Sequence, residues 1–290
     1  MTMKLKYIIL YFLILMVFQT KSQELERPFI LVKSSERNQI LNKIKTKTWA
    51  NKIYTTLKSN ADKQVDEFYK NPSTYLKNLP FNWVGAKKNE FPPFFKTDHI
   101  ENGKHRNLDN ATDKEWKPAA LLIENLQIAL DCGYLYYLTQ DEKYAYVASS
   151  ILYSFTKSVR KSKMSKWKGR GGLLFPYDGF REVRVIGYRL PLIYDFIATY
   201  LKNNGKSFDI IQNKKVSFPL NEAQKVFKTY ANITVNYGQT GSNHPVLEAP
   251  SLVYNALALD DKKERKKWLS YFLSESTQNQ GVFNPSSFRI

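Results

Sequence analysis

The chain has 290 residues, of which 43% are hydrophobic and 14% aromatic, and it carries 44 Lys and Arg against 26 Asp and Glu. This composition excludes a disordered chain, and the length allows one large domain or two small ones. The single cysteine, Cys132, excludes an intrachain disulfide. Because it lies in an apolar helical pattern, we expect it to be a small buried residue.

Residues 1–22 have the pattern of an export signal. Lys4 and Lys6 precede an apolar run at 7–18, and a polar stretch follows. The run, at about 12 residues, is too short to span a bilayer comfortably, so we expect cleavage near Ser22 and no stable membrane anchor. No cysteine lies directly after the apolar run, where a lipoprotein would carry its lipid, which argues against a lipoprotein. The sequence thus predicts a protein that is periplasmic or secreted, with one mature domain at 23–290.

The positive charge persists without the leader, which contains three lysines and no acids, so a formal net charge of +15 remains. Nucleic acid is the usual partner of such a surplus, but an exported protein seldom meets it. An acidic polysaccharide fits both observations. The densest basic stretch, 157–170, has seven Lys or Arg and includes Trp167. It is either a solvated helix end and loop, or a cationic rim with an aromatic platform for an anionic sugar chain.

Helical periodicity dominates the mature chain. Ser34 or Ser35 can cap a first helix, in which Ile40, Ile44 and Trp49 mark apolar turns. Further helices are predicted at 114–139, 142–159, 180–202, 221–237, 245–259 and 262–276.

Two connections between these helices are informative. Residues 71–114 contain four prolines and no clear period, which predicts a functional loop or lid. The short polar break at 138–145 predicts antiparallel neighbouring helices. No strand pattern of comparable strength is present, so the sequence predicts an all-α fold of successive helical hairpins. Periodicity alone leaves open a flat bundle or a closed ring.

An Asn-His pair precedes one of these helices. Pro245 is favoured at the first position of a helix, which puts His244 at the cap and Asn243 just before it. Backbone amides and the positive end of the helix dipole attract a carboxylate to such a place. The alternative is that both side chains only satisfy local turn hydrogen bonds.

This pair suits the chemistry of a polyuronate lyase, which removes the proton on C5 and expels the sugar oxygen on C4. The adjacent carboxylate must be neutralised by donors such as Asn, His or Arg, and Tyr or His can serve as base and acid. We expect neither a metal nor a cofactor. A metal site in which His99 and His105 join Asp98 and Asp109 is a less favoured alternative.

Four stretches carry a family resemblance: RPFILVKSSERNQILNKI at 27–44, LTQDEKYA at 138–145, YDGFREVRVIGYRLPLIYDFI at 177–197 and SNHPVLEAP at 242–250. They resemble the helical-toroid domain of alginate lyases and heparinase-like polysaccharide lyases, above all the Bacteroidetes-type alginate or glucuronan lyases with a single toroid. The resemblance covers 27–290 and its strict motif is the Asn-His pair. It implies an incomplete (α/α) toroid that cleaves alginate, glucuronan or a related polyuronate by β-elimination.

The resemblance also implies roles for residues. Asn243 would neutralise the carboxylate, and His244 would assist it or act as the base. The similar lyases also use a Tyr and an Arg further along, in a window that begins here near Arg289. Arg289 is therefore the candidate arginine, and the tyrosine is expected beyond Ile290, as in a truncated gene product.

Tyr177 is the best replacement for this tyrosine within the chain, because Tyr188 and Tyr254 lie in apolar helical patterns. Just after it, Arg181 and Arg184 either grip substrate carboxylates with their bidentate forks or form exposed ion pairs at a helix start.

The predicted substrate-binding residues are Trp167, Arg181, Arg184 and Glu248. The rival function is an inverting glycoside hydrolase, in which Asp178 or Glu182 would work with Glu248. A binder of acidic polysaccharide without catalysis is the third. The sequence leaves open the preferred uronic acid, internal or terminal cutting, syn or anti elimination, and the oligomeric state.

Overall fold

The computed structural model describes residues 25–77, 79, 100–101, 104–105, 113–166, 171–175, 179–238 and 244–273. The predicted leader therefore lies outside the described residues. Within them, no helix is both long and apolar enough to cross a membrane.

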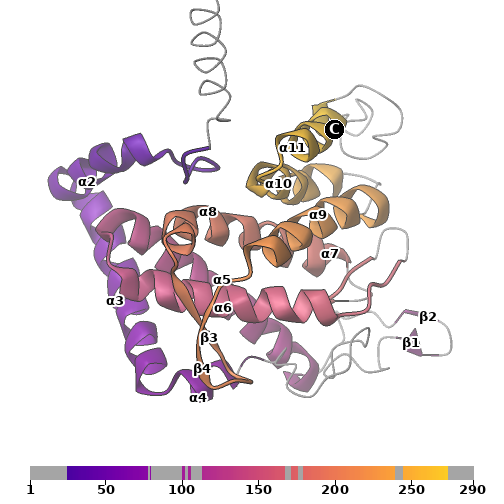
Figure 1. Cartoon of the computed structure of the whole chain (residues 1–290), viewed down its shortest axis with the longest axis horizontal. Coiled ribbons are helices and arrows are strands. Elements are labelled where there is room, and N and C mark those ends of the chain that lie inside the picture. The colour runs from indigo at the N-terminus through magenta and orange to yellow at the C-terminus, as the bar shows by residue number, and fades with distance from the viewer. Residues whose placement is uncertain are drawn as a thin grey trace, which may run out of the picture.

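Helices make up most of this part of the chain, so the predicted all-α class is confirmed (Figure 1). In chain order the elements are η1 (Ser34–Glu36), α2 (Arg37–Thr46), α3 (Thr48–Lys70), α4 (Pro72–Lys77), β1 (Ile100–Glu101), β2 (Lys104–His105), α5 (Asp113–Thr139), α6 (Glu142–Lys161), α7 (Gly179–Arg181), the π-helix η4 (Glu182–Gly187), α8 (Arg189–Lys202), β3 (Lys206–Asp209), β4 (Lys214–Ser217), α9 (Leu220–Tyr237), α10 (His244–Ala258) and α11 (Lys262–Leu273). A closed toroid stays a prediction.

Helix α6 lies at the centre, packed against α5, α8, α9 and β3. Its residues from Tyr144 to Tyr153 are all buried, and the two serines among them, Ser149 and Ser150, donate hydrogen bonds to backbone carbonyls. The carboxylate of Asp141 accepts a hydrogen bond from the Lys143 amide at 3.0 Å and caps its first turn. Helices α5 and α6 form the predicted antiparallel pair, with Gln140 in the left-handed region at φ 60°. In α5, Cys132 is buried and unpaired, as predicted.

Most helix boundaries agree with the sequence, and three features do not. The first predicted helix divides at Lys47 into α2 and α3. The segment 71–114 contains α4 and the short antiparallel pair β1 and β2, while the rest of it lies outside the described residues. The helix predicted at 180–202 is interrupted by the π-helix η4.

The antiparallel hairpin of β3 and β4 was not predicted from the sequence. It pairs Lys206 with Ser217 and Asp209 with Lys214. Four residues per strand are too few for an alternating pattern to stand out. Its turn is instead held by Asp209, whose carboxylate accepts the Ile211 amide at 2.8 Å and the Gln212 amide at 3.1 Å.

A buried ion pair fixes the first described residues to helices that come much later. The guanidinium of Arg27 lies 2.8 Å from the carboxylate of Asp195 in α8, and both side chains are almost fully buried. Arg27 also donates to the Ala258 carbonyl at the end of α10, at 2.9 Å. The second oxygen of Asp195 accepts the amides of Phe29 and Ile30, each at 2.9 Å. The N-terminal stretch is thus part of the folded domain.

Candidate functional site

The π-helix η4 is the centre of the candidate site. Such segments insert an extra residue into a helix, weaken its regular hydrogen bonding and occur frequently at functional sites. Here the carbonyl of Gly187 is bonded by the buried amide of Asn255 in α10, at 2.7 Å. A Cβ on Gly187 would lie 2.4 Å from the Ser251 hydroxyl oxygen. Glycine therefore allows α10 to pass directly against the π-helix.

Glu182, the first residue of the π-helix, has a fully buried carboxyl group. One oxygen accepts the Tyr230 hydroxyl of α9 at 2.5 Å. The other accepts the amides of Leu174 at 2.8 Å and Phe175 at 2.6 Å. Burial raises the pKa of Glu182 above its ordinary value, although these donors oppose the shift. Glu182 thereby fixes the loop 171–175 to the π-helix.

Arg184 and Glu248 join the π-helix to α10. Their side chains approach within 3.3 Å and are only 7% and 2% exposed. Glu248 lies four residues, or about one turn, after His244, which begins α10. A Cβ on Gly238, at the end of α9, would lie 2.3 Å from a Glu248 oxygen, so glycine is needed there as well. The Glu248 carboxyl group thus lies where α9, α10 and the π-helix meet.

The loop 171–175 completes this meeting point. Its Gly171 amide donates to the Tyr237 carbonyl of α9 at 3.2 Å, and Gly172 pairs with Ser165 after the end of α6. The next described residue after Phe175 is Gly179, the start of α7. The start of α10, the end of α9, the π-helix and this loop therefore converge in one region, which we call the α10 junction.

The predicted site residues fall into two groups. The structure brings Arg184 and Glu248 into contact with each other at the α10 junction, and it places Arg181 at the end of α7, half-buried. His244 is the first residue of α10, one position before the predicted start of this helix. Its side chain is not among those that the structure describes. The remaining predicted residues lie outside the described residues: Asn243, Tyr177, Trp167 and Arg289, together with Asp178 of the rival hydrolase pair. Their roles stay predictions.

Sequence reasoning missed the polar residues that support the junction, Tyr230, Ser251 and Asn255. Each stands in a helical pattern that reads as ordinary core, so nothing local singles it out. One signal was available, because Gly187 interrupts a strongly helical pattern and such glycines often have a packing reason.

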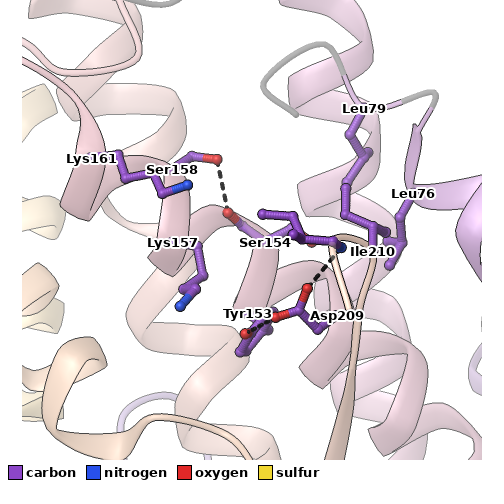
Figure 2. Close-up of a pocket in the computed structure, with 10 residues that line it drawn as sticks. Leu76, Leu79, Tyr153, Ser154, Lys157, Ser158, Lys161, Asp209 and Ile210 are labelled. Carbon is purple, nitrogen blue, oxygen red and sulfur yellow. Dashed lines mark hydrogen bonds between the residues drawn. The ribbon is translucent and has the colours of Figure 1, made fainter. Parts of the chain in front are cut away.

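The predicted basic stretch begins in the second half of α6, where its first lysines line a pocket (Figure 2). Lys157 and Lys161 line it together with the hydroxyl-bearing residues of the same helix face. The Tyr153 hydroxyl donates to the Asp209 carboxylate at 2.5 Å, and Leu76 forms part of the opposite wall. Apolar side chains supply most of this lining, so the pocket offers an anionic sugar only the two lysines at its edge.

Among the described residues, no cluster of three or more His, Cys, Asp or Glu side chains could hold a metal ion. The two carboxylates of the junction are already occupied, Glu182 by hydrogen-bond donors and Glu248 by Arg184.

Comparisons with known proteins found one similarity that extends along most of the chain. No family model matches, and no solved structure matches. An endo-acting ulvan lyase of Formosa agariphila is 29% identical over 283 residues, which cover 93% of this chain and 31% of that protein. The chain therefore spans about a third of the length of its curated relative. Over nearly its whole length, it is similar to one part of an endo-acting ulvan lyase.

Proposed function

We propose that this chain is an exported polysaccharide lyase domain that cleaves an acidic, uronate-containing polysaccharide by β-elimination. The observation that carries the proposal is the similarity to an endo-acting ulvan lyase along 93% of the chain. The helical fold and the Asn-His pair at the start of α10 support it independently.

The proposed reaction uses two groups at the start of α10. Asn243 donates hydrogen bonds to the carboxylate next to C5, which lets negative charge move onto it. His244 either assists Asn243 in neutralising the carboxylate or takes the C5 proton as the base. Tyr177 protonates the departing oxygen. The C4–O bond breaks as a double bond forms between C4 and C5, and one proton moves from C5 to the leaving oxygen. Arg289 would help to hold the carboxylate.

The buried groups of the α10 junction have a positioning role in this proposal. The Arg184–Glu248 pair ties the first turns of α10 to the π-helix, and Glu182 ties down the loop 171–175. A displacement of about 1 Å in a catalytic group is enough to lower a rate about 100-fold. The Arg184–Glu248 ion pair and the hydrogen bonds of Glu182 would therefore affect the turnover rate without contacting the reacting atoms.

The rival glycoside hydrolase is disfavoured by the same contacts. An inverting hydrolase needs one carboxylate that activates a water and one carboxylic acid that protonates the leaving oxygen. Glu182 is fully buried and Glu248 is 1% exposed. Neither reaches a water or a sugar in this arrangement, so the proposed hydrolase pair lacks the access that its mechanism requires.

The similarity to an ulvan lyase makes ulvan the first substrate to test, ahead of alginate and glucuronan. The purified chain is incubated with ulvan, polymannuronate, polyguluronate, glucuronan and a neutral glucan, while absorbance of the unsaturated uronate is followed. We expect a rise with at least one acidic polymer and none with the glucan.

Variants then test the residues. His244→Ala and Asn243→Ala should each lower turnover by on the order of 100-fold, because each removes a group that acts on the reacting centre. Asn38→Ala, an exposed change in α2, is the matched control and should leave turnover unchanged. New reducing ends without the absorbance would indicate a hydrolase, and binding without either product would indicate a binding protein.

A further inference from the structure

A second pocket lies where α3 ends, α6 begins and α8 passes into the β3–β4 hairpin. Its volume is about 270 Å³, slightly below the range of roughly 300–1,000 Å³ that is usual for small-molecule sites, as for a pocket that takes one or two sugar units. Three tyrosines line it, Tyr69, Tyr146 and Tyr200. We call it the tyrosine pocket.

Tyr69 offers an aromatic surface that is already held in place. Its side chain is 48% exposed, although its ring packs at 5.8 Å against Phe68 and at 5.8 Å against Tyr146. A ring with few rotatable bonds and fixed neighbours loses little entropy when a ligand covers it. The flat C–H face of a pyranose is a suitable cover for such a ring. The tyrosine pocket therefore has a preorganised platform for a sugar.

The positive charge of the pocket comes from lysines on the hairpin. The Lys215 ammonium lies 4.8 Å from the centre of the Tyr146 ring, and Lys206 donates to the Ser217 hydroxyl at 3.1 Å. Among the described residues, neither lysine has a carboxylate within ion-pair distance. Lys143, also in the lining, lies 3.4 Å from the Asp62 carboxylate, so its charge is partly compensated. Glu142 also lines the pocket and contributes one negative charge, so Lys206 and Lys215 on the hairpin side are the groups available for an anionic group.

Polar groups at the rim are fixed by the turn after α8. Asn204 takes the left-handed conformation at φ 63°, which turns the chain sharply towards the hairpin. The Tyr200 hydroxyl donates to the Lys206 carbonyl at 2.8 Å and accepts its amide at 2.9 Å. The exposed side chains of Asn203 and Asn204 are thereby presented beside the lysines, where amides can bond sugar hydroxyl groups.

The tyrosine pocket is remote from the α10 junction. It adjoins the start of α6 and the end of α8, whereas the junction adjoins the opposite ends of the same helices (Figure 1). At 1.5 Å per residue, the 20 residues of α6 span roughly 30 Å. A sugar bound in the tyrosine pocket would therefore lie several residues of polymer away from the proposed place of cleavage.

We propose that the tyrosine pocket is a second binding site for an anionic polysaccharide, which holds the polymer on the domain at a distance from the proposed cleavage site. The polymer class rests on the proposed function, but the binding itself requires no catalysis.

The test measures retention of the full chain in native gels that contain ulvan or, separately, polymannuronate. All proteins carry His244→Ala, so that the polymer stays intact. We expect Tyr69→Ala, and the double change Lys206→Gln with Lys215→Gln, each to weaken retention at least about fivefold. This loss corresponds to roughly 1 kcal/mol, which is within the range of an exposed cation or aromatic contact.

Matched controls lie close by. Lys214→Gln removes one positive charge from the same hairpin, half of what the lysine double variant removes, and Trp49→Ala removes an exposed aromatic ring from the same helix as Tyr69. Neither Lys214 nor Trp49 lines the pocket. Both should be retained like the parent protein. If Lys214→Gln loses as much retention per charge removed as the lysine double variant, the attraction is general and the proposal is overturned. Unchanged retention of the pocket variants would overturn it as well. If the protein that retains His244 shows no lyase activity, the proposed function fails, but the retention measured with the His244→Ala proteins still decides the binding proposal.

Discussion

A carboxyl group buried as completely as that of Glu182 is tolerated only while its hydrogen-bond donors are in place. The Tyr230 hydroxyl and the amides of Leu174 and Phe175 supply them. Burial nevertheless raises the pKa of Glu182 above that of the unfolded chain. Ionising this group therefore costs stability as the pH rises through its folded pKa.

Tyr230→Phe should destabilise the fold by about 1–3 kcal/mol, because it removes one donor from a buried acid. The Tyr230 hydrogen bond lowers the pKa of Glu182, so its loss raises that pKa further. The destabilisation should thus be greater at pH 8 than at pH 4. Urea unfolding at both pH values measures it.

Tyr137→Phe is the matched control for this change. The Tyr137 hydroxyl is also largely buried, but it donates to the backbone carbonyl of Lys33 at 3.0 Å, which does not titrate. Its loss should cost the same at both pH values. If the two variants show the same pH dependence, the Glu182 explanation is wrong.

At the scale of elements, the contact between the π-helix and α10 decides the geometry of the candidate site. Gly187→Ala should lower stability by about 1–3 kcal/mol and also lower turnover, since its Cβ would lie 2.4 Å from the Ser251 hydroxyl oxygen. Ser251→Ala removes that oxygen, so the double variant should recover part of both losses. Thermal unfolding and the lyase assay test this. Losses that simply add would contradict a direct clash.

The elements also show how far the sequence could be interpreted. The helices around 114–139 and 221–237 were predicted closely, because each carries its own period of apolar residues. The π-helix could not be predicted, because the carbonyl of its last residue, Gly187, is hydrogen-bonded by Asn255, which comes 68 residues later in the chain. The β3–β4 hairpin was too short to produce a pattern.

The same reasoning applies to the candidate site. The position of His244 at the start of α10 was predicted to within one residue from Pro245 alone. The pairing of Arg184 with Glu248 was not predicted, because the two residues are 64 positions apart and each was equally consistent with substrate contact. Local rules locate helix ends, while pairing across the chain depends on the tertiary fold.

At the scale of the whole molecule, the ion pair of Arg27 with Asp195 joins the N-terminal stretch to α8. Asp195→Asn should lower the free energy of unfolding by about 3 kcal/mol, because the buried guanidinium loses its buried countercharge and keeps only Asp260, at 3.1 Å, whose side chain is half exposed. Glu222→Gln breaks the more exposed pairs with Arg160 and Lys225 and should cost less, about 1 kcal/mol. Chemical unfolding compares them. If both variants lose the same free energy of unfolding, other groups must stabilise the charge of Arg27 when Asp195 is replaced.

This ion pair also determines when folding can finish. Arg27 and Asp195 are 168 positions apart, and Arg27 and Ala258 are 231 apart. Because a chain is made from its N-terminus, Arg27 is synthesised long before Asp195 and Ala258, and it lacks its partners until most of the described residues have been made. Contacts of such long sequence separation slow folding. The stretch around Arg27 should therefore gain protection from proteases in a nascent chain only after α10 has been made, although it is synthesised well before α8 and α10.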